Sequence, residues 1–455
     1  MSVRRMLLCS AMLLTIAGGR AAAQTNDEIF PQFQWNFSTP GARANAMGRT
    51  FIGLADDASA AITNPAGLVS LTRPQVYVEF KNTDVKVNRL AAVDSLFTLN
   101  PTTFSTNVSD LSFFNVSAPI GKRAAVGFTF HQYLNNQETF HLAPRPVPDV
   151  NNPSKLVSNG TALFSVDGSS DFKGASYAGT IAVMITNQLR AGVTVAANTF
   201  DASATATRFR SSFGAAYPGN ITAISETGII ANQTQTSGSD TQLSANFGLL
   251  FKPNDMVSVG FDYTRNPSFN LDESFFSNPG FNNNVNQPLT AFSGFTNPTV
   301  FSINVPNRFG FGVSAHPMDK LLVGADVVRV QYSSLAKNTL IVLSFSDPTV
   351  SSDKFSIDDA TEVHFGGEYN VYSVGSTSAF VRAGVFTNPD HSTKFSATIP
   401  DNTTNSVYNA IYNLLPRETQ VVGTFGAGVT VGLHFQVDAA YVWKKEAVVS
   451  AAVRF

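Results

Sequence analysis

Charged side chains are scarce in this sequence, and long apolar runs are absent after its N-terminal segment. Asp, Glu, Lys and Arg make up 14% of the 455 residues, well below the quarter that is usual for soluble globular proteins. A helical membrane protein is excluded by the second absence, because such a chain needs apolar stretches of about 20 residues. A transmembrane β-barrel meets both conditions, since only every second residue of its strands faces lipid.

Cysteine is nearly absent as well. The single cysteine, Cys9, lies in a segment with the order of a secretory signal peptide, in which two arginines precede an apolar run and three alanines end at Ala23. We expect cleavage near Ala23 and export of residues 24–455, although a buried N-terminal helix is the alternative. The mature protein then has neither disulfides nor thiolate chemistry.

Features of enzymes and of nucleic-acid-binding proteins are also missing. Removing the three arginines of residues 1–23 leaves 27 basic against 32 acidic residues, a balance that argues against a nucleic-acid partner. The chain has no Walker loop, and its six histidines show no metal-ligand spacing. His364 has acids nearby but no serine partner for nucleophilic catalysis. We therefore expect no enzymatic activity, no metal and no cofactor.

Alternation of apolar and polar residues recurs along the rest of the chain. In Gln242–Lys252, every second residue from Leu243 to Phe251 is apolar, whereas Gln242, Ser244, Asn246 and Gly248 are polar or small. We expect fourteen strands, at residues 75–89, 107–118, 124–140, 172–185, 190–210, 241–252, 256–270, 307–316, 320–336, 362–371, 378–387, 419–430, 434–443 and 446–455. The predicted fold is all-β, a 14-stranded antiparallel transmembrane β-barrel over residues 74–455.

The connections between these strands alternate in length. Short turns face long polar loops at residues 90–106, 141–171, 211–240, 271–305, 337–361 and 387–418, a pattern typical of outer-membrane barrels. An even strand count places both barrel ends in the periplasm. The alternating last strand ends in Phe455 and resembles the closing strand of bacterial outer-membrane barrels, where a terminal aromatic belongs to the assembly signal. An ordinary C-terminal strand is the alternative.

Residues 24–73 precede the first strand and lack its alternation. Because fourteen strands enclose more space than their side chains fill, the simplest place for this segment is inside the barrel, as a plug or hatch. Residues 55–62, ADDASAAI, predict a short helix with acids in its first turn. Asn64 then predicts a helix cap, Pro65 the first helical position and Gly67 the end of that turn.

A family resemblance follows from these residues. The stretch Gly41–Leu68 resembles the N-terminal hatch of the FadL family, whose Asn-Pro-Ala motif matches Asn64, Pro65 and Ala66. Residues 305–334 and 380–389 resemble a middle hairpin and a later strand of the same family. The resemblance implies an outer-membrane channel for passive uptake of long-chain fatty acids or other hydrophobic compounds, such as aromatic hydrocarbons. Ligand would leave as the hatch shifts or through a gap near the third strand, where Asn135-Asn136 is a possible weak point.

A second function fits the same resemblance. A FadL-like barrel can act as a structural or secretion-partner protein of the outer membrane without transporting solute. The expected partners under the first reading are hydrophobic small molecules, outer-membrane lipid and the barrel-assembly machinery, with a monomeric channel.

Two groups of residues are candidate sites. The loop at 271–305 carries aromatics that either form an apolar mouth for ligand or pack the loop's own core: Phe275, Phe276, Phe281, Phe292, Phe295 and Phe301. Period-2 alternation also places charged residues in the lumen: Asp262, Asp326, Glu362, His364, Glu368 and Asp438, with Arg382 on a neighbouring strand. Arg382 either binds a ligand carboxylate or joins an ion-pair network between wall and hatch. Asp326 and Arg329 require a bulge between them.

Overall fold

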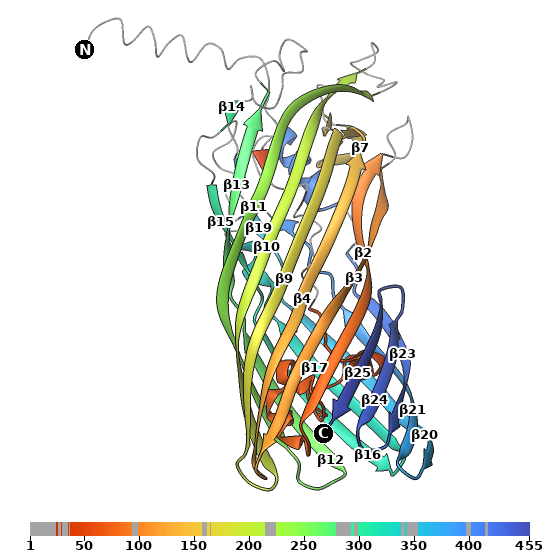
Figure 1. The fold of residues 1–455 in the computed structure, drawn as a ribbon. Helices are drawn as coiled ribbons and strands as arrows, with labels where there is room; N and C mark the ends of the chain where they lie inside the picture. The colour runs from red at the N-terminus through yellow and green to blue at the C-terminus, as the bar shows by residue number, and fades with distance from the viewer. Residues whose placement is uncertain are drawn as a thin grey trace, which may run out of the picture.

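Fourteen antiparallel wall strands close into a barrel in the described part of this computed structural model (Figure 1). The structure describes residues 24–25, 29, 35, 37–92, 99–156, 162–163, 165–213, 224–278, 293–294, 299–337, 342–343, 354–396, 402–414 and 417–455. Twelve wall strands are continuous: β2 (Gln75–Ala92), β3 (Leu99–Ile120), β4 (Ala124–Leu142), β9 (Ser165–Met184), β10 (Leu189–Phe213), β11 (Ile224–Phe251), β17 (Leu321–Val330), β20 (Ala360–Val374), β21 (Thr377–Asn388), β23 (Gln420–Val431), β24 (Phe435–Val442) and β25 (Glu446–Arg454). The predicted fold class is confirmed.

The other two wall strands are each built from two pieces. They are β12 (Val257–Arg265) with β13 (Ser268–Ser277), and β15 (Thr299–Asn304) with β16 (Arg308–Met318). Both interruptions contain a proline, Pro267 and Pro306, which has no N–H to donate to a ladder. The two breaks lie side by side, because β12 pairs with β16 and β13 pairs with β15. The Asn266 side chain bridges them by donating to the carbonyl oxygen of Pro306 at 2.7 Å.

The alternation predicted for the wall is present in the structure. Leu243, Phe247 and Phe251 are exposed on the outer face of β11, whereas Asn246 between them is buried. The bulge predicted near Asp326 is absent, because β17 pairs in unbroken register with β20 over all of its ten residues. Arg329 instead faces outward, where its guanidinium lies 3.7 Å from a carboxylate oxygen of Asp359.

Several predicted loops are partly strand. β2 and β3 stay paired up to Ala92 and Leu99, so residues 90–92 and 99–106 of the expected loop belong to strands. The loop expected at 387–418 contains the helix α4 (Asn402–Tyr412). Figure 1 shows that β4, β9, β10 and β11 rise well above the side formed by β20 to β25. Within the described residues, no helix has the length and apolar character of a membrane span.

The two ends of the barrel sequence meet at the end that carries the short turns. β25 pairs with β2 from Arg454 opposite Gln75 to Glu446 opposite Thr83. The backbone N–H of Phe455 donates to the carbonyl oxygen of Pro74 at 2.9 Å. The Phe455 side chain is 66% exposed, so the terminal aromatic ring stands outside the barrel.

Candidate functional site: hatch, upper lumen and wall opening

The segment before β2 folds into three short helices inside the lower half of the barrel (Figure 1). They are α2 (Ala42–Ala46), α3 (Ala60–Thr63) and the 3-10 helix η1 (Pro65–Ser70). We call residues 41–71 the hatch. The predicted acids do not lie in a first helical turn, because α3 begins only at Ala60. Asp57 instead accepts hydrogen bonds from the N–H and hydroxyl of Ser59, at 2.8 and 2.6 Å.

Asn64 joins three parts of the molecule. Its side-chain oxygen accepts from the N–H of Ala66 and so caps η1, with Pro65 at the first helical position as predicted. Its side-chain nitrogen donates to the carbonyl oxygen of Ile52 in the hatch at 2.8 Å and to that of Leu249 in the wall at 3.1 Å. The side chain is fully buried, and its bonds to Ile52 and Ala66 are buried with it.

Gly67 does not end a turn, contrary to expectation. The helix η1 continues to Ser70, and a Cβ atom at position 67 would overlap the backbone of Ala55. This glycine is required because two parts of the hatch approach each other closely.

Several wall glycines lie against the hatch. A Cβ atom at any of these positions would overlap hatch atoms: Gly192, Gly248, Gly260, Gly312, Gly366 and Gly384. Gly192 and Gly248 face Pro65 and Asn64, and Gly260 faces Ile52. The hatch is thus seated against the wall by close backbone contact at these positions.

Charged wall residues hold the same segment. Asp326 accepts hydrogen bonds from the backbone N–H groups of Phe51 and Ile52, at 2.7 and 2.9 Å. The hatch residue Arg43 lies 2.6 Å from Asp56 and 2.8 Å from Glu368. These contacts attach the hatch to β17 and β20, three and four strands along the wall from β11, which Asn64 contacts.

Arg382 takes part in this network. Its guanidinium lies 2.6 Å from Glu368 and 2.8 Å from Asp438, and its side chain is 1% exposed. The sequence left two roles open for Arg382, which were an ion-pair network and ligand binding. The structure contains the ion pairs of the first role. A role of Arg382 toward a ligand stays a prediction.

The remaining predicted lumen charges lie higher. His364 has one ring nitrogen 3.3 Å from Glu362 and the other 3.2 Å from the carbonyl oxygen of Arg49. Glu362 also accepts from the hydroxyl of Tyr332 at 3.1 Å. Asp262 is buried on the lumen face of β12, where the hydroxyl of Thr264 lies 3.5 Å away.

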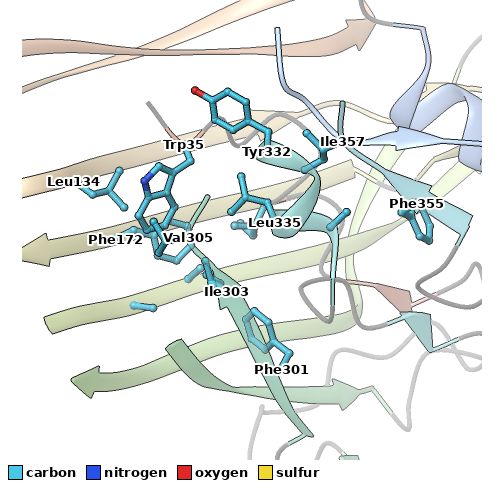
Figure 2. Packing of buried hydrophobic residues seen from close by; sticks show 14 of the residues in the cluster. Trp35, Leu134, Phe172, Phe301, Ile303, Val305, Tyr332, Leu335, Phe355 and Ile357 are labelled. Carbon is cyan, nitrogen blue, oxygen red and sulfur yellow. The ribbon is translucent and has the colours of Figure 1, made fainter. Parts of the chain in front are cut away.

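Above the hatch, the lumen is filled by apolar side chains. Trp35 is fully buried there, with its ring centroid 6.0 Å from that of Tyr133 and 5.7 Å from that of Phe200. Phe200 in turn stacks on Phe172 and Phe269, at 6.1 and 5.2 Å. We call these five residues the aromatic stack. Figure 2 shows Trp35 beside Leu134, Phe172 and Val305, within one cluster that extends to Phe301.

Three of the predicted mouth aromatics lie in this region. Phe301 on β15 is buried in the apolar cluster, Phe275 on β13 is buried, and Phe276 on the same strand is half-buried. The other three, Phe281, Phe292 and Phe295, lie outside the described residues. The described members sit on wall strands that continue upward, rather than in a loop.

The wall is open between β3 and β4. These strands pair only from Ile120 opposite Ala124 to Phe113 opposite His131. Above that point β3 continues along β2, and β4 continues along β9. The β4–β9 register shifts between Gln132 and Leu134, so the irregularity lies just before the predicted weak point. Asn135 spans the opening by donating to Asp110 at 2.8 Å.

A cavity of about 870 Å³ lies behind this opening. Its lining combines residues of β3 and β4, such as Ser112 and Leu134, with Phe37 from the segment that leads to the hatch. Tyr133 lines the cavity and also belongs to the aromatic stack. Leu134 and Phe37 likewise line the cavity and pack in the apolar cluster, so the upper lumen adjoins the opening in the wall.

Sequence patterns did not identify the aromatic stack. Tyr133 and Phe200 alternate along their strands like any wall residues, and the register shift between Gln132 and Leu134 depends on the partner strand. Trp35 offered one signal, because it is one of only two tryptophans in the chain and lies in a segment without strand pattern.

Comparison with known proteins agrees with this architecture. The family profile described as outer membrane protein transport protein (OMPP1/FadL/TodX) matches residues 33–408. A FadL homologue from Pseudomonas aeruginosa is 13% identical, with 93% of this chain and 96% of that chain covered and a TM-score of 0.61. The toluene transporter TbuX from Ralstonia pickettii is 14% identical, with 93% and 100% covered and a TM-score of 0.56.

A third structure, the toluene transporter TodX from Pseudomonas putida, is 14% identical, with 92% and 98% covered and a TM-score of 0.53. At such identities the structural likeness shows the fold alone. No curated protein sequence matches the chain. The profile, however, covers most of the sequence, and the closed barrel agrees with it. The chain therefore belongs to the OMPP1/FadL/TodX family of outer-membrane channels that transport hydrophobic compounds.

Proposed function

We propose that this protein takes up long-chain fatty acids or aromatic hydrocarbons by passive diffusion through the plugged barrel. The observation that carries the proposal is an apolar upper lumen above a hatch that is bonded to the wall. An apolar solute gains free energy by leaving water for this lumen, at about 25 cal/mol for each Å² of apolar surface removed from water. Residues 24–73 then form the plug domain and residues 74–455 the channel.

The bonds between hatch and wall favour lateral exit of the solute through the barrel wall. Asn64, Asp326 and Arg43 each bond hatch to wall, and the wall glycines are in backbone contact with it. Moving the hatch would break several buried hydrogen bonds, each of which costs about 1–3 kcal/mol when its groups are left unsatisfied. A solute that leaves between β3 and β4 breaks fewer hydrogen bonds, since the Asn135–Asp110 bond spans the opening. That exit delivers an apolar solute to the outer leaflet of the same membrane.

The direct test measures uptake of radiolabelled oleate and toluene into liposomes that contain the purified chain. We expect saturable uptake of at least one compound, and no uptake of a charged sugar phosphate. Deleting residues 24–73 should replace saturable uptake by a non-selective leak. Absence of saturable uptake for every hydrophobic compound would overturn the proposal and favour a structural or secretion-partner role.

A further inference from the structure

β3 and β4 keep a common register above the point where their backbone pairing ends. The ladder between them stops at Phe113 opposite His131. Phe104 and Phe140 each lie nine residues above that end, so a continued ladder would place them opposite each other. Their ring centroids are 6.1 Å apart. We call the stretch between these two levels the seam, because side chains join the two strands there in place of a ladder.

A buried ion pair crosses the seam at its upper end. The guanidinium of Arg89 on β2 donates to both carboxylate oxygens of Glu138 on β4, each at 2.8 Å. The two side chains are 4% and 6% exposed. A two-point bond between guanidinium and carboxylate is stronger and more directional than a bond between neutral groups. Because β3 pairs with β2 on one side and with β4 lower down on the other, the ion pair passes across β3 and ties the two sides of the seam together.

The Phe140 ring is fixed beside this ion pair. The guanidinium carbon of Arg89 lies 3.8 Å from the ring centroid, within the range of a cation–π interaction. The ring also lies against β9, where a Cβ atom at Gly168 would overlap it. Ion pair and ring form one buried unit, and we call these three residues, Arg89, Glu138 and Phe140, the latch.

The seam is held differently below the latch. There Asn135 donates to Asp110 at 2.8 Å, and both side chains are half-buried. The cavity behind the wall reaches the seam at this level and is lined by Leu134, Asn135 and Glu138. From His131 to Glu138 the strand is about 20 Å long, at about 3.3 Å per residue. An opening of this height is bounded by the ladder at one end and by the latch at the other.

We infer that the latch sets the largest solute cross-section that can pass between β3 and β4. The opening widens when the two strands separate, and strands that are held at both ends separate least. A slim solute needs the Asn135–Asp110 bond to break, whereas a bulky solute also needs Arg89 and Glu138 to part. Arg89 and Glu138 are thus specificity-determining residues of the exit. This inference rests on the proposed function, because it concerns the exit route of the same channel.

The first experiment measures the width of the seam in the absence of solute. Ser105 and Thr139 are exposed, and a continued ladder would place them opposite each other. Residues 24–455 contain no cysteine, so Ser105→Cys with Thr139→Cys accepts one spin label on each strand. Glu138→Gln keeps the shape of the side chain and removes its charge. The distance between the labels, measured by electron paramagnetic resonance, should therefore shift to longer values.

The matched control places the same labels across an intact ladder. Ser169 lies opposite Thr205 in the paired strands β9 and β10. Labels at Ser169→Cys with Thr205→Cys should show the same distance with and without Glu138→Gln. A shift in both label pairs would mean that the substitution disturbs the whole wall, and it would overturn the assignment of the latch to the seam.

The second experiment measures saturable uptake of toluene and of the bulkier triphenylmethane into liposomes. Glu138→Gln should raise the ratio of triphenylmethane to toluene uptake roughly tenfold, because a hydrogen bond between charged groups is strong enough to shift an opening equilibrium by about that factor. Glu273→Gln removes another buried carboxylate of the upper wall, at a position where β13 is paired with β11. This control should leave the ratio unchanged.

A second variant keeps the inference falsifiable if Glu138→Gln does not fold. Arg89→Gln with Glu138→Gln leaves no unpaired buried charge and should shift both measurements in the same direction. An unchanged label distance or an unchanged uptake ratio in the folded variants overturns the inference. Absence of saturable uptake by the wild-type protein would instead overturn the proposed function, and the label distance would still decide whether the latch holds the seam.

Discussion

At the scale of single residues, polar groups in the lumen are used to hold apolar segments in place. Asn64 fixes the hatch to β11, and Asp326 fixes it to β17. A third example is His391, beyond the end of β21. Its ring stacks on that of Tyr332 at a centroid distance of 3.8 Å and interacts with the backbone of Trp35. Each polar group is buried, so losing its partner leaves an unsatisfied group in an apolar surrounding.

Asn64→Ala should loosen the hatch while the barrel still assembles. The change removes the cap of η1 and the bonds to Ile52 and Leu249, a loss of about 1–3 kcal/mol for the buried groups left unpaired. Pro65→Gly should act in the same direction by freeing the first position of η1. We expect larger and more frequent current steps in planar bilayers. Asn88→Ala removes an exposed amide that bonds Thr103, and it should behave as wild type.

His391 predicts acid sensitivity of the Trp35 segment. Burial lowers the pKa of His391 below its ordinary value, an effect that the backbone of Trp35 and the carboxylates of Glu362 and Asp390 oppose only in part. The folded state therefore favours neutral histidine. The stability that this contributes is present above the unfolded pKa of about 6.5 and is lost as the pH falls through the folded pKa.

Fluorescence can test this directly, because Trp443→Phe leaves Trp35 as the only tryptophan. Its emission should be that of a buried indole at neutral pH and shift to longer wavelength as the pH falls below about 6.5. His391→Gln cannot titrate and should flatten the curve. An identical shift in the His391→Gln protein would show that another group is responsible.

At the scale of elements, alternation predicted the wall and its short turns, because a strand between lipid and lumen must change polarity at every residue. Alternation does not predict the parts of the strands that extend beyond the lipid. Residues 99–106, LNPTTFST, are polar on both faces and resemble a loop, yet they form part of β3. The register shift near Tyr133 depends on the partner strand β9, which a single sequence segment cannot specify. Trp35 belongs to no periodic element, so its position was not predictable.

Gly248→Ala should displace the hatch, although alanine suits a strand better than glycine does. A Cβ atom there would overlap the Asn64 side chain and come within 2.8 Å of the Pro65 ring. Overpacking of this kind costs about 1–3 kcal/mol. Trypsin should then cut faster at Arg43 and Arg49 in the folded barrel. Gly179→Ala has open space around its new Cβ atom, so equal cutting rates in the two variants would contradict the seating of hatch on wall.

A disulfide across the opening between β3 and β4 should block uptake. Residues 24–455 contain no cysteine, and the side chains of Asp110 and Asn135 meet at 2.8 Å, so Asp110→Cys with Asn135→Cys gives a single reversible link within this part of the chain. We expect uptake of hydrophobic solute to fall on oxidation and to return on reduction. Ser373→Cys with Ser378→Cys is the matched control at a short turn, where the two hydroxyls lie 3.2 Å apart. Undiminished uptake through the first link would exclude this exit.

At the scale of the whole molecule, the two halves of the barrel differ: the lower half is closed and the upper half has an apolar lumen beside an opening in the wall. Its lower half is closed by a hatch that bonds to strands around the circumference, from β11 to β20. Its upper half encloses apolar side chains under a wall that is unpaired between β3 and β4. The last strand β25 completes the ring by pairing with β2, which leaves no free strand edge at that seam. The terminal Phe455 contributes little to that ring, since its side chain points out of it.

Because the Phe455 side chain is exposed, an effect of this residue on barrel assembly can be measured separately from an effect on barrel stability. Phe455→Ala removes an exposed ring and keeps the backbone hydrogen bond to Pro74, so the stability of the refolded barrel in detergent should be almost unchanged. The amount of folded protein in the outer membrane of cells should nevertheless fall severalfold, because the barrel-assembly machinery would lose its recognition residue. Heat-modifiable mobility on gels reports the folded fraction in both settings. Val449→Ala, another outward apolar residue of β25, is the control and should leave assembly unaffected. Equal losses in cells and in detergent would mean that Phe455 acts through stability alone.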